Sequence, residues 1–567
     1  MKRSSPSNSS IFRRILIFLI PFLILLTLAF FQIFNLMVLS ADEFKTQADS
    51  NRILKERVFP PRGLILDRND EIVVENFIRQ DLKVTPSFVE DYSLYISNLS
   101  ELMNYETSKI EDIFYKKLNE IKPFQSFTLI RNLNDEQIAK LNLNLSKFSG
   151  TEIIPNFSRN VTEGESLGSV VGYLGFASKN SILEDPNLKN FSDQQIGLLG
   201  IEKEYDDFLR GEIGYKFLEK DSKGNVIKVL STEPPKKGKN LKLSIDLELQ
   251  RTLFKEFTGK KGALIAIEPE TGFIRALISS PSYDPNYLNN FYSEEIEKIL
   301  KDENSPLFNR AVSGQYPPAS TLKPFIGLAA LEEQVITWDE KIHDQGEFFV
   351  EGDDRPYRGW KEEGHGFVNM ESAIAESSDV YFYNIAFDLT VSSISPFLAK
   401  FGFGSSSKLL GNESKGILPD KKWKLGQKGE FWFKGDTINM GIGQGYILTT
   451  PLQIAIAYSA LVNEGQLITP RIVESIDGVA TEFSSERIEL KNNENWELIK
   501  KALVSVVESN KGTAHNLFDP KKRIAGKTGT AQVKSLINDI KYQEIRENEL
   551  LRDHALFVGY GPIEKPS

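Results

Sequence analysis

The longest apolar stretch of the chain lies near its N-terminus. No residue from Ile15 to Leu39 carries a charge, and a run of about 25 residues can cross the roughly 30 Å hydrocarbon core of a membrane. Basic residues precede this run and acidic residues follow it (Lys2, Arg3, Arg13 and Arg14 before; Asp42 and Glu43 after). This bias predicts a transmembrane anchor over 15–39, with the tail 1–14 in the cytoplasm and the remainder on the outer side. The alternative is a cleaved signal peptide, whose apolar region is usually only about 7–15 residues long.

Residues 40–240 mix strand-like and helix-like patterns. The apolar alternation on either side of Arg68–Asp70 predicts a hairpin. Charged amphipathic segments at 93–103, 108–121 and 134–145 predict surface helices, and the polar segment 41–58 also has a helix-like pattern. We find no nucleophile, metal or phosphate motif in this part of the sequence. We therefore interpret 40–240 as a pedestal or dimerisation-type domain for spacing and docking.

A loop rich in proline, lysine and glycine marks the start of a second domain over 241–567. Asp246 is placed to cap a helix over 247–257, and the turn Glu268–Gly272 separates two apolar runs that predict a strand hairpin. Two more strands are predicted far downstream, at 523–534 and 554–562, after a long and mostly helical insert. An antiparallel sheet whose strands come from both ends of a domain, with helices between them, is an α+β fold.

Composition and charge narrow the function classes. The 567 residues have a net charge of −10, whereas binding to nucleic acid calls for a basic face. Because the chain contains no cysteine, a disulfide, a thiolate nucleophile and a cysteine-based zinc site are all excluded. None of the four histidines lies near a serine–glycine elbow, which argues against a Ser-His-Asp enzyme.

The segment Gly314–Phe325, GQYPPASTLKPF, contains the first candidate chemistry. Its two prolines cannot lie inside a helix, so the apolar helix that follows begins near Ser320. A serine at that place is usually a capping residue. Lys323, however, follows at a spacing that puts it on the same helix face. A lysine whose pKa is lowered by burial and by the helix dipole can activate a serine hydroxyl.

Two further motifs suit the same chemistry. Ser377–Asp379, Ser-Ser-Asp, offers a second hydroxyl that can relay a proton between the lysine and a leaving group. Lys527–Thr530, Lys-Thr-Gly-Thr, lies on a predicted strand whose glycine lets an extended peptide approach the strand edge. Its lysine and threonines can receive a carboxylate. Each motif alone is a weak signal, but the three in this order and context are far rarer.

This trio resembles the Ser-x-x-Lys, Ser-x-Asn and Lys-Thr-Gly motifs of penicillin-binding proteins and serine β-lactamases. Longer segments are similar to the penicillin-binding protein 2 family, the class B transpeptidases of cell elongation: GQYPPASTLKP, ESSDVYFYN, NMGIGQGYILTTPLQIA and AGKTGTAQV. The anchor, PPRGLILDRND and LGIEKEYDDFLRG also fit that family's membrane helix and pedestal. Asp379 matches the elongation type, because the septal relatives usually have asparagine there.

The resemblance implies catalytic roles for Ser320, Lys323, Ser377, Asp379 and Lys527. Ser320 would attack the D-Ala-D-Ala carbonyl of a peptidoglycan stem peptide and form an acyl-enzyme. Lys323 would be the general base, and Ser377 would shuttle the proton toward the leaving group. Asp379 would hold this network in place. Penicillin would acylate the same serine, and the amine of a second stem peptide would complete the cross-link.

The resemblance also implies how the substrate is held. Lys527, with Thr528 and Thr530, would bind the terminal carboxylate of the stem peptide. Gly529 would leave room for the peptide beside the strand. The backbone N–H groups of Ser320 and Thr530 would form the oxyanion hole.

Two features depart from the family pattern. Some relatives hold a zinc ion with Asp, Asp, His and Cys, and in this sequence the corresponding positions are Asp344, Gly359, His365 and Ser378. Two remaining ligands do not make a structural zinc site, so we expect no metal and no cofactor, with His365 in a packing or hydrogen-bonding role. The family domain also continues with a further strand and a long helix after the strand at 554–562, and we expect the sequence to be truncated at its C-terminal end.

Two other functions share these motifs. One is a membrane-anchored serine β-lactamase, against which the pedestal, the anchor and the lack of a deacylating glutamate motif argue. The other is a catalytically silent scaffold or receptor with the penicillin-binding fold.

For a transpeptidase, the resemblance implies stem peptides, β-lactams, the membrane and a polytopic glycan polymerase of the elongation machinery as partners, and no nucleic acid. It also implies an inner-membrane protein with its catalytic domain in the periplasm.

Overall fold

The computed structural model describes residues 8–39, 53–191, 194–220, 226–352, 356–532 and 552–566. The chain divides into two compact units, which we describe separately. One comprises Met1–Pro60 and Glu212–Lys237, and the other comprises Pro61–Gly211 and Gly238–Ser567. Each unit is thus built from two stretches of the chain that are distant in sequence.

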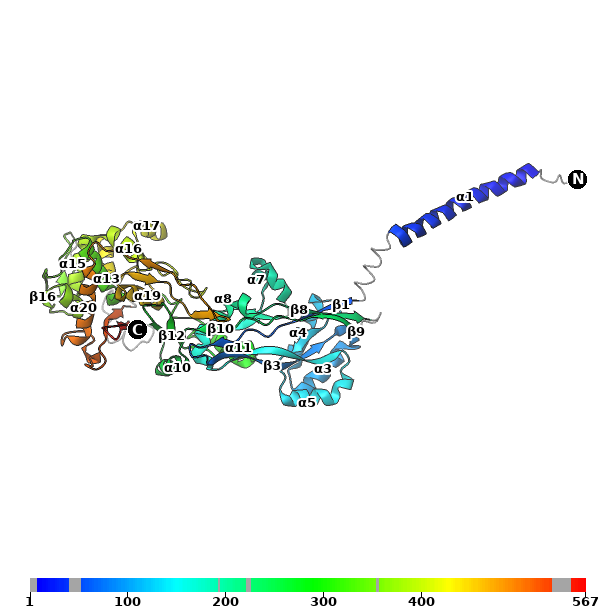
Figure 1. Ribbon diagram of the computed structural model, residues 1–567, viewed down its shortest axis with the longest axis horizontal. Helices are drawn as coiled ribbons and strands as arrows, with labels where there is room; N and C mark the ends of the chain where they lie inside the picture. Colours follow the sequence, from blue (N-terminus) through cyan, green and yellow to red (C-terminus); the bar gives the residue numbers. More distant parts are fainter. Residues whose placement is uncertain are drawn as a thin grey trace. The chain divides into compact units, whose positions relative to one another are not determined.

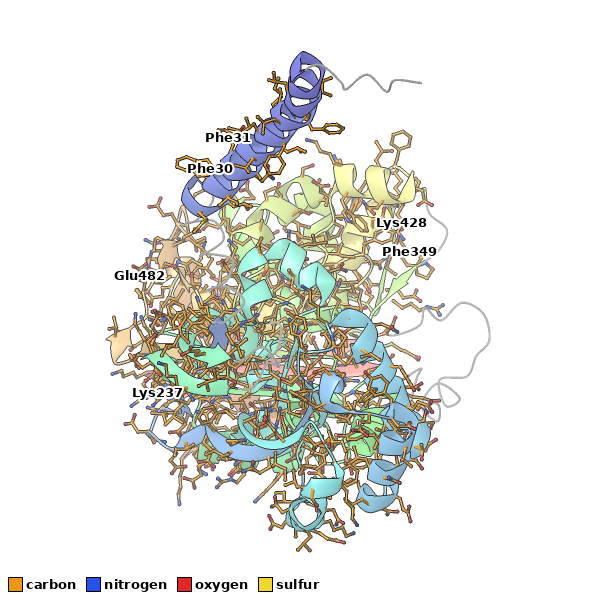
Figure 2. The ribbon with its side chains drawn as sticks, turned by 90° about the vertical axis from the view of Figure 1, so that its right-hand side faces the viewer. Phe30, Phe31, Lys237, Phe349, Lys428 and Glu482 are labelled. Carbon is orange, nitrogen blue, oxygen red and sulfur yellow. The ribbon has the colours of Figure 1, made fainter. Side chains whose placement is uncertain are left out.

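The first unit contains the long apolar helix α1, Asn8–Phe34, which continues as a short π-helical segment over Asn35–Leu39. The segment Leu16–Met37 has a mean hydropathy of 2.7 and is not buried within the protein. Figure 2 shows the side chains of Phe30 and Phe31 projecting from this helix into open space. A helix this long, apolar and exposed is compatible with the predicted single-pass membrane anchor.

The same unit contains a three-stranded antiparallel sheet in the order β1 (Ile53–Val58), β8 (Gly214–Lys220) and β9 (Val226–Glu233). The helix-like interpretation of 41–58 is therefore wrong for 53–58, while 41–52 lies outside the described residues. All six residues of β1 pair with β8. Because this partner strand lies far along the chain, the local pattern could not reveal the pairing.

The largest sheet of the second unit has the strand order β19-β18-β10-β2-β3-β4, and β5 also pairs with β3. Its strands are β2 (Ile65–Leu66), β3 (Ile72–Val84), β4 (Phe127–Ile130), β5 (Thr151–Val161), β10 (Leu241–Leu243), β18 (Val473–Ile476) and β19 (Val479–Ala480). The antiparallel pairing of β2 with β3 confirms the predicted hairpin. The carboxylate of Asp67 holds its turn by accepting hydrogen bonds from the backbone N–H groups of Asn69 and Glu71.

The predicted surface helices of the pedestal are confirmed as α3 (Tyr92–Met103), α4 (Thr107–Glu120) and α5 (Asp135–Asn144). They lie on β4 and the end of β3 (Figure 1), and bury a shared apolar core that includes Leu99 and Phe114. Elsewhere in this unit, a buried charge cluster joins three segments: Glu202 accepts from both Arg62 and Arg159, at 2.7 and 2.8 Å. Because a buried charge is tolerated only when it is paired, this cluster fixes the three segments against one another.

The strands predicted for the remaining part are also present. Asp246 caps α10 (Leu247–Glu256) by accepting from the backbone N–H of Leu249, and β11 (Gly262–Ile267) pairs with β12 (Ile274–Ser280) around the predicted turn. Far downstream, β21 (Ala525–Ala531) pairs with β22 (His554–Tyr560). In the described part of the chain these two pairs form separate two-stranded sheets. Residues of β11 and β22 line one cavity of about 900 Å³.

A helical core lies between the two strand pairs in sequence. Its helices are α13 (Lys323–Glu332), α14 (Met370–Ala375), α15 (Asp379–Leu389), α16 (Val391–Ala399), α19 (Pro451–Val462) and α20 (Glu494–Glu508). All residues of α13 except Leu331 are buried, as expected for a helix that is apolar around its whole circumference. The surrounding helices thereby hold the start of α13, which directly follows the turn that contains the candidate nucleophile, in a fixed position.

Candidate active site

The candidate nucleophile lies in a tight turn that leads into α13. Ala319–Leu322 forms a 3₁₀ turn, and the backbone N–H of Lys323 donates to the carbonyl of Ser320. No side chain caps this turn or the start of α13, so the capping interpretation of Ser320 is wrong. Its hydroxyl is half-buried and available for other chemistry.

Residues outside the three motifs hold this turn in place. Ala319 has a left-handed backbone with φ of 49°, and its N–H donates to the carbonyl of Gly443 at 2.8 Å. A Cβ on Gly443, whose φ is 71°, would lie 2.1 Å from the carbonyl oxygen of Ala319, so only glycine fits. The hydroxyl of Tyr458, on α19, donates to the carbonyl of Thr321 at 2.7 Å. Sequence reasoning assigned these residues no role.

Lys323 is fully buried and its ammonium group faces the second motif. Nζ donates to the carbonyl of Ser377 at 2.8 Å, to the hydroxyl of Ser377 at 3.2 Å, and to Oδ1 of Asp379 at 2.7 Å. Burial lowers the pKa of Lys323 below its ordinary value, and the carboxylate of Asp379 offsets only part of this effect. A lysine in this state can give up its proton and act as a base.

Lys527, in the third motif, also contacts the hydroxyl of Ser377. It is fully buried on β21, and its Nζ donates to the hydroxyl of Ser377 at 2.9 Å. Burial and the nearby charge of Lys323 lower the pKa of Lys527 well below its ordinary value. The Ser377 oxygen thus accepts from two amines and still has its own proton to donate. This geometry suits a hydroxyl that passes protons.

Ser377 is itself held in an uncommon conformation. Its φ is 59°, in the left-handed region, and the next residue caps α15, because the hydroxyl of Ser378 accepts from the backbone N–H of Tyr381. A non-glycine residue in this region is strained and is retained where the surroundings fix it. The cap and the two lysines together determine where the Ser377 hydroxyl lies.

Strand β21 lies directly against the nucleophile turn. A Cβ on Gly529 would lie 3.1 Å from Cγ2 of Thr321 and 3.4 Å from the carbonyl oxygen of Pro318. Thr530 is exposed, and its carbonyl accepts from the side chain of Gln444 at 3.2 Å. Thr528 is half-buried and shares a hydrogen bond with the hydroxyl of Thr513. The three sequence motifs therefore converge on one place, and Gln444 and Thr513 are additions that the motifs did not predict.

Asp344, His365 and Ser378, three of the four positions named above for a zinc site, are joined by hydrogen bonds. The carboxylate of Asp344 accepts from the hydroxyl of Ser378 at 2.6 Å, and its contact with Nδ1 of His365 is also 2.6 Å. Burial alone would raise the pKa of Asp344, but the hydrogen bonds from His365 and Ser378 hold it below its ordinary value. His365 is thus a hydrogen-bonded histidine, as predicted. Among the described residues no three His, Cys, Asp or Glu side chains are grouped as metal ligands.

Comparison with known proteins agrees with this geometry. The penicillin binding protein transpeptidase domain matches residues 262–567, and the penicillin-binding protein dimerisation domain matches residues 57–243. Peptidoglycan D,D-transpeptidase MrdA of Haemophilus influenzae is 35% identical, over 98% of this chain and 87% of its own length.

Two solved structures are similar along most of the chain. The complex between penicillin-binding protein PBP2 and MreC from Helicobacter pylori matches with a TM-score of 0.80 and 29% identity, covering 91% of this chain and 93% of the other. A peptidoglycan synthase complex, described as coordinating polymerization and crosslinking, matches with a TM-score of 0.67 and 25% identity, covering 98% and 93%. The chain therefore belongs to the penicillin-binding protein 2 family of peptidoglycan D,D-transpeptidases.

Proposed function

We propose that this chain cross-links peptidoglycan stem peptides through an acyl-enzyme on Ser320. The observation that supports this most strongly is the convergence of two buried lysines, Lys323 and Lys527, on the hydroxyl of Ser377, next to the Ser320 turn. Such an arrangement moves protons at a serine nucleophile without a histidine. The family relationship gives the substrate class, because the relatives are peptidoglycan D,D-transpeptidases.

In the acylation step, Lys323 in its neutral form takes the proton of Ser320. The oxygen of Ser320 forms a bond to the carbonyl carbon of the penultimate D-alanine, and the developing oxyanion accepts from the backbone N–H groups of Ser320 and Thr530. Ser377 passes a proton to the amide nitrogen as the C–N bond breaks, and terminal D-alanine leaves. The proton balance closes, because the proton lost by the serine reaches the leaving amine through Lys323 and Ser377.

In the second step, the amine of another stem peptide attacks the ester carbonyl. The same residues work in reverse: Ser377 and Lys323 accept the amine proton, and Ser320 receives it as its bond to the acyl group breaks. The product is a new amide bond between two peptides. Asp379 holds the amine of Lys323 in position by accepting a hydrogen bond from it.

The substrate's terminal carboxylate is held on β21. Thr530 is exposed and Thr528 is half-buried at the surface of this strand, and the amine of Lys527 donates to the carbonyl of Thr528 at 3.2 Å. Gly529 lets this strand lie close to the Ser320 turn, because a Cβ there would lie 3.1 Å from Cγ2 of Thr321. Penicillin, a cyclic acyl donor that also has a carboxylate, occupies the same place and acylates Ser320.

We also propose the membrane orientation of the chain, its partner protein and its domain boundaries. The basic residues before the apolar run that begins at Ile15 support a tail in the cytoplasm and a catalytic domain in the periplasm of the inner membrane. A polytopic glycan polymerase of the elongation machinery is the proposed partner, supported by similarity to a synthase complex that coordinates polymerization and crosslinking. The pedestal and catalytic domains are proposed to span 40–240 and 241–567.

Binding of a fluorescent penicillin to the full chain in detergent tests the reaction class. We expect one covalent adduct per chain that persists after unlabelled penicillin is added, and release of D-alanine from a stem-peptide donor in the presence of an acceptor amine. Rapid loss of the adduct would favour a β-lactamase. No adduct on folded protein would favour a silent scaffold, and either result would contradict the proposal.

Asp379→Asn should shift the pH dependence of acylation toward lower pH. The carboxylate of Asp379 raises the pKa of Lys323 and thereby opposes the effect of burial. Removing this charge lowers that pKa further, so the neutral amine forms at a lower pH. We expect the acidic limb of the rate profile to move to lower pH, as measured by stopped-flow acylation with a chromogenic β-lactam.

Asp420→Asn is a matched control, because Asp420 caps α17 (Lys421–Lys428) and asparagine caps helices equally well. Its profile should follow that of the wild type. A shift of the Asp379→Asn profile toward higher pH would contradict the assignment of Lys323 as the base.

A further inference from the structure

Trp360 makes two hydrogen bonds to the second motif although most of its surface is exposed. Its backbone N–H donates to Oδ2 of Asp379 at 3.0 Å, and its indole N–H donates to the carbonyl of Ser377 at 3.1 Å. The side chain as a whole is 61% exposed. Lys323 donates to the other carboxylate oxygen of Asp379 and to the same carbonyl of Ser377. Trp360 therefore shares with the proposed general base the carbonyl of Ser377 and the carboxylate of Asp379.

The segment that contains Trp360 is fastened at its base by Asp344. The backbone N–H of Gly359 donates to the carbonyl of Gly346, and the N–H of Gly346 donates to Oδ1 of Asp344 at 2.8 Å. Oδ2 of Asp344 accepts from the hydroxyl of Ser378 and from Nδ1 of His365. The ring of His365 packs edge-on against Trp360 at 5.5 Å. One carboxylate thus joins the Trp360 segment to the start of α15.

A zinc ion of the kind that some relatives hold does not fit these residues. Gly359 has no donor, and the hydroxyl of Ser378 is used twice, toward Asp344 and as the cap of α15. Asp344 is bonded to Nδ1 of His365, whereas Nε2 is the buried nitrogen without a hydrogen-bond partner. The two potential ligands therefore do not converge on one point, as tetrahedral coordination would require.

We propose that the hydrogen-bonded cluster of Asp344, His365 and Ser378 fastens the Trp360 segment without a metal, and that Trp360 is a positioning residue for Ser377 and Asp379. This inference rests on the proposed function, because its effect is measured on acylation. Holding Ser377 in place matters for the reaction, because this residue has a strained backbone conformation. Its carbonyl, held by both Lys323 and Trp360, fixes where the proton-relaying hydroxyl lies.

Trp360→Phe tests the positioning role, because it keeps the backbone N–H and an aromatic ring but removes the indole donor. In the full chain we expect the maximal acylation rate at saturating penicillin to fall about tenfold, the usual effect of one lost hydrogen bond. The apparent dissociation constant for penicillin and the thermal midpoint should stay at wild-type values. Trp432→Phe is the matched control, since it removes an indole hydrogen bond to Thr437 outside the site, and its rate should be unchanged.

A double-mutant cycle tests whether Asp344 acts through Trp360. Asp344→Asn should also lower the maximal rate, and the double variant should lose less than the product of the two single losses, because both changes disrupt one device. Losses that simply multiply would overturn the connection. A wild-type rate in Trp360→Phe would overturn the positioning role while leaving the proposed function intact, whereas absence of acylation in the wild type would instead contradict the proposed function.

The zinc content of the purified chain tests separately whether the cluster holds a metal. We expect the purified chain to contain no stoichiometric zinc by elemental mass spectrometry, including after incubation with zinc and desalting. Its acylation rate and thermal midpoint should be unchanged by a chelator. One tightly held zinc ion per chain, whose removal lowers the rate or the midpoint, would overturn the proposal.

Discussion

Ser320→Ala should abolish covalent acylation by β-lactams while the protein stays folded. The hydroxyl of Ser320 provides the atom that bonds to the acyl group, and no other group in the site replaces a lost nucleophile. We expect the acylation rate constant to fall by at least about 10⁴-fold, measured by intact mass spectrometry after incubation with penicillin. Because the residue is half-buried in a turn that its neighbours hold, the smaller side chain should leave the thermal midpoint nearly unchanged.

Ser313→Ala provides the comparison for this variant. Its hydroxyl donates to the carbonyl of Asn412 and lies in the same part of the sequence, so it loses a serine hydrogen bond without touching the site. It should be acylated like the wild type. Retained acylation in Ser320→Ala would show that another residue is the nucleophile.

Lys323→Met should slow acylation by about 10²–10⁴-fold, the range expected for the loss of a general base. Methionine has a similar length and suits the fully buried position, so the change removes the amine with little loss of packing. The bound penicillin should still be held by β21, so the loss should fall on the maximal rate rather than on the apparent dissociation constant. Stopped-flow acylation over a range of penicillin concentrations separates the two.

The matched control is Lys424→Met, because Lys424 is also buried and ion-paired, in this case to Asp436 outside the site. It should lower the thermal midpoint and leave the maximal acylation rate unchanged. Equal losses of rate in the two lysine variants would indicate a general loss of folding rather than the loss of a base.

Much of the local structure could be predicted because it depends on local chemistry. The turn at Arg68–Asp70, the cap at Asp246 and the β11–β12 hairpin follow from residues that are close in sequence. The convergence of the three motifs was also predictable, but only through their resemblance to a family. Spacing alone could not place Lys527 beside Ser377, since 150 residues separate them.

The remaining features depend on contacts between distant segments. Strand β1 resembled a helix in its local pattern, yet it pairs with β8. Gly443 is required because Ala319 approaches it, and its role is visible only when both are placed. Nothing in the local sequence distinguishes Trp360, whose two hydrogen bonds go to Asp379 and Ser377. In each case the decisive partner lies outside the local sequence segment.

Peptide mapping of the penicillin adduct tests the central assignment directly. The full chain is incubated with penicillin, digested, and the modified peptide is sequenced by tandem mass spectrometry. We expect the mass of the intact β-lactam to be added to the side chain of Ser320 and to no other residue. An adduct on Ser377, Ser378 or any other residue, with Ser320 unmodified, would contradict it.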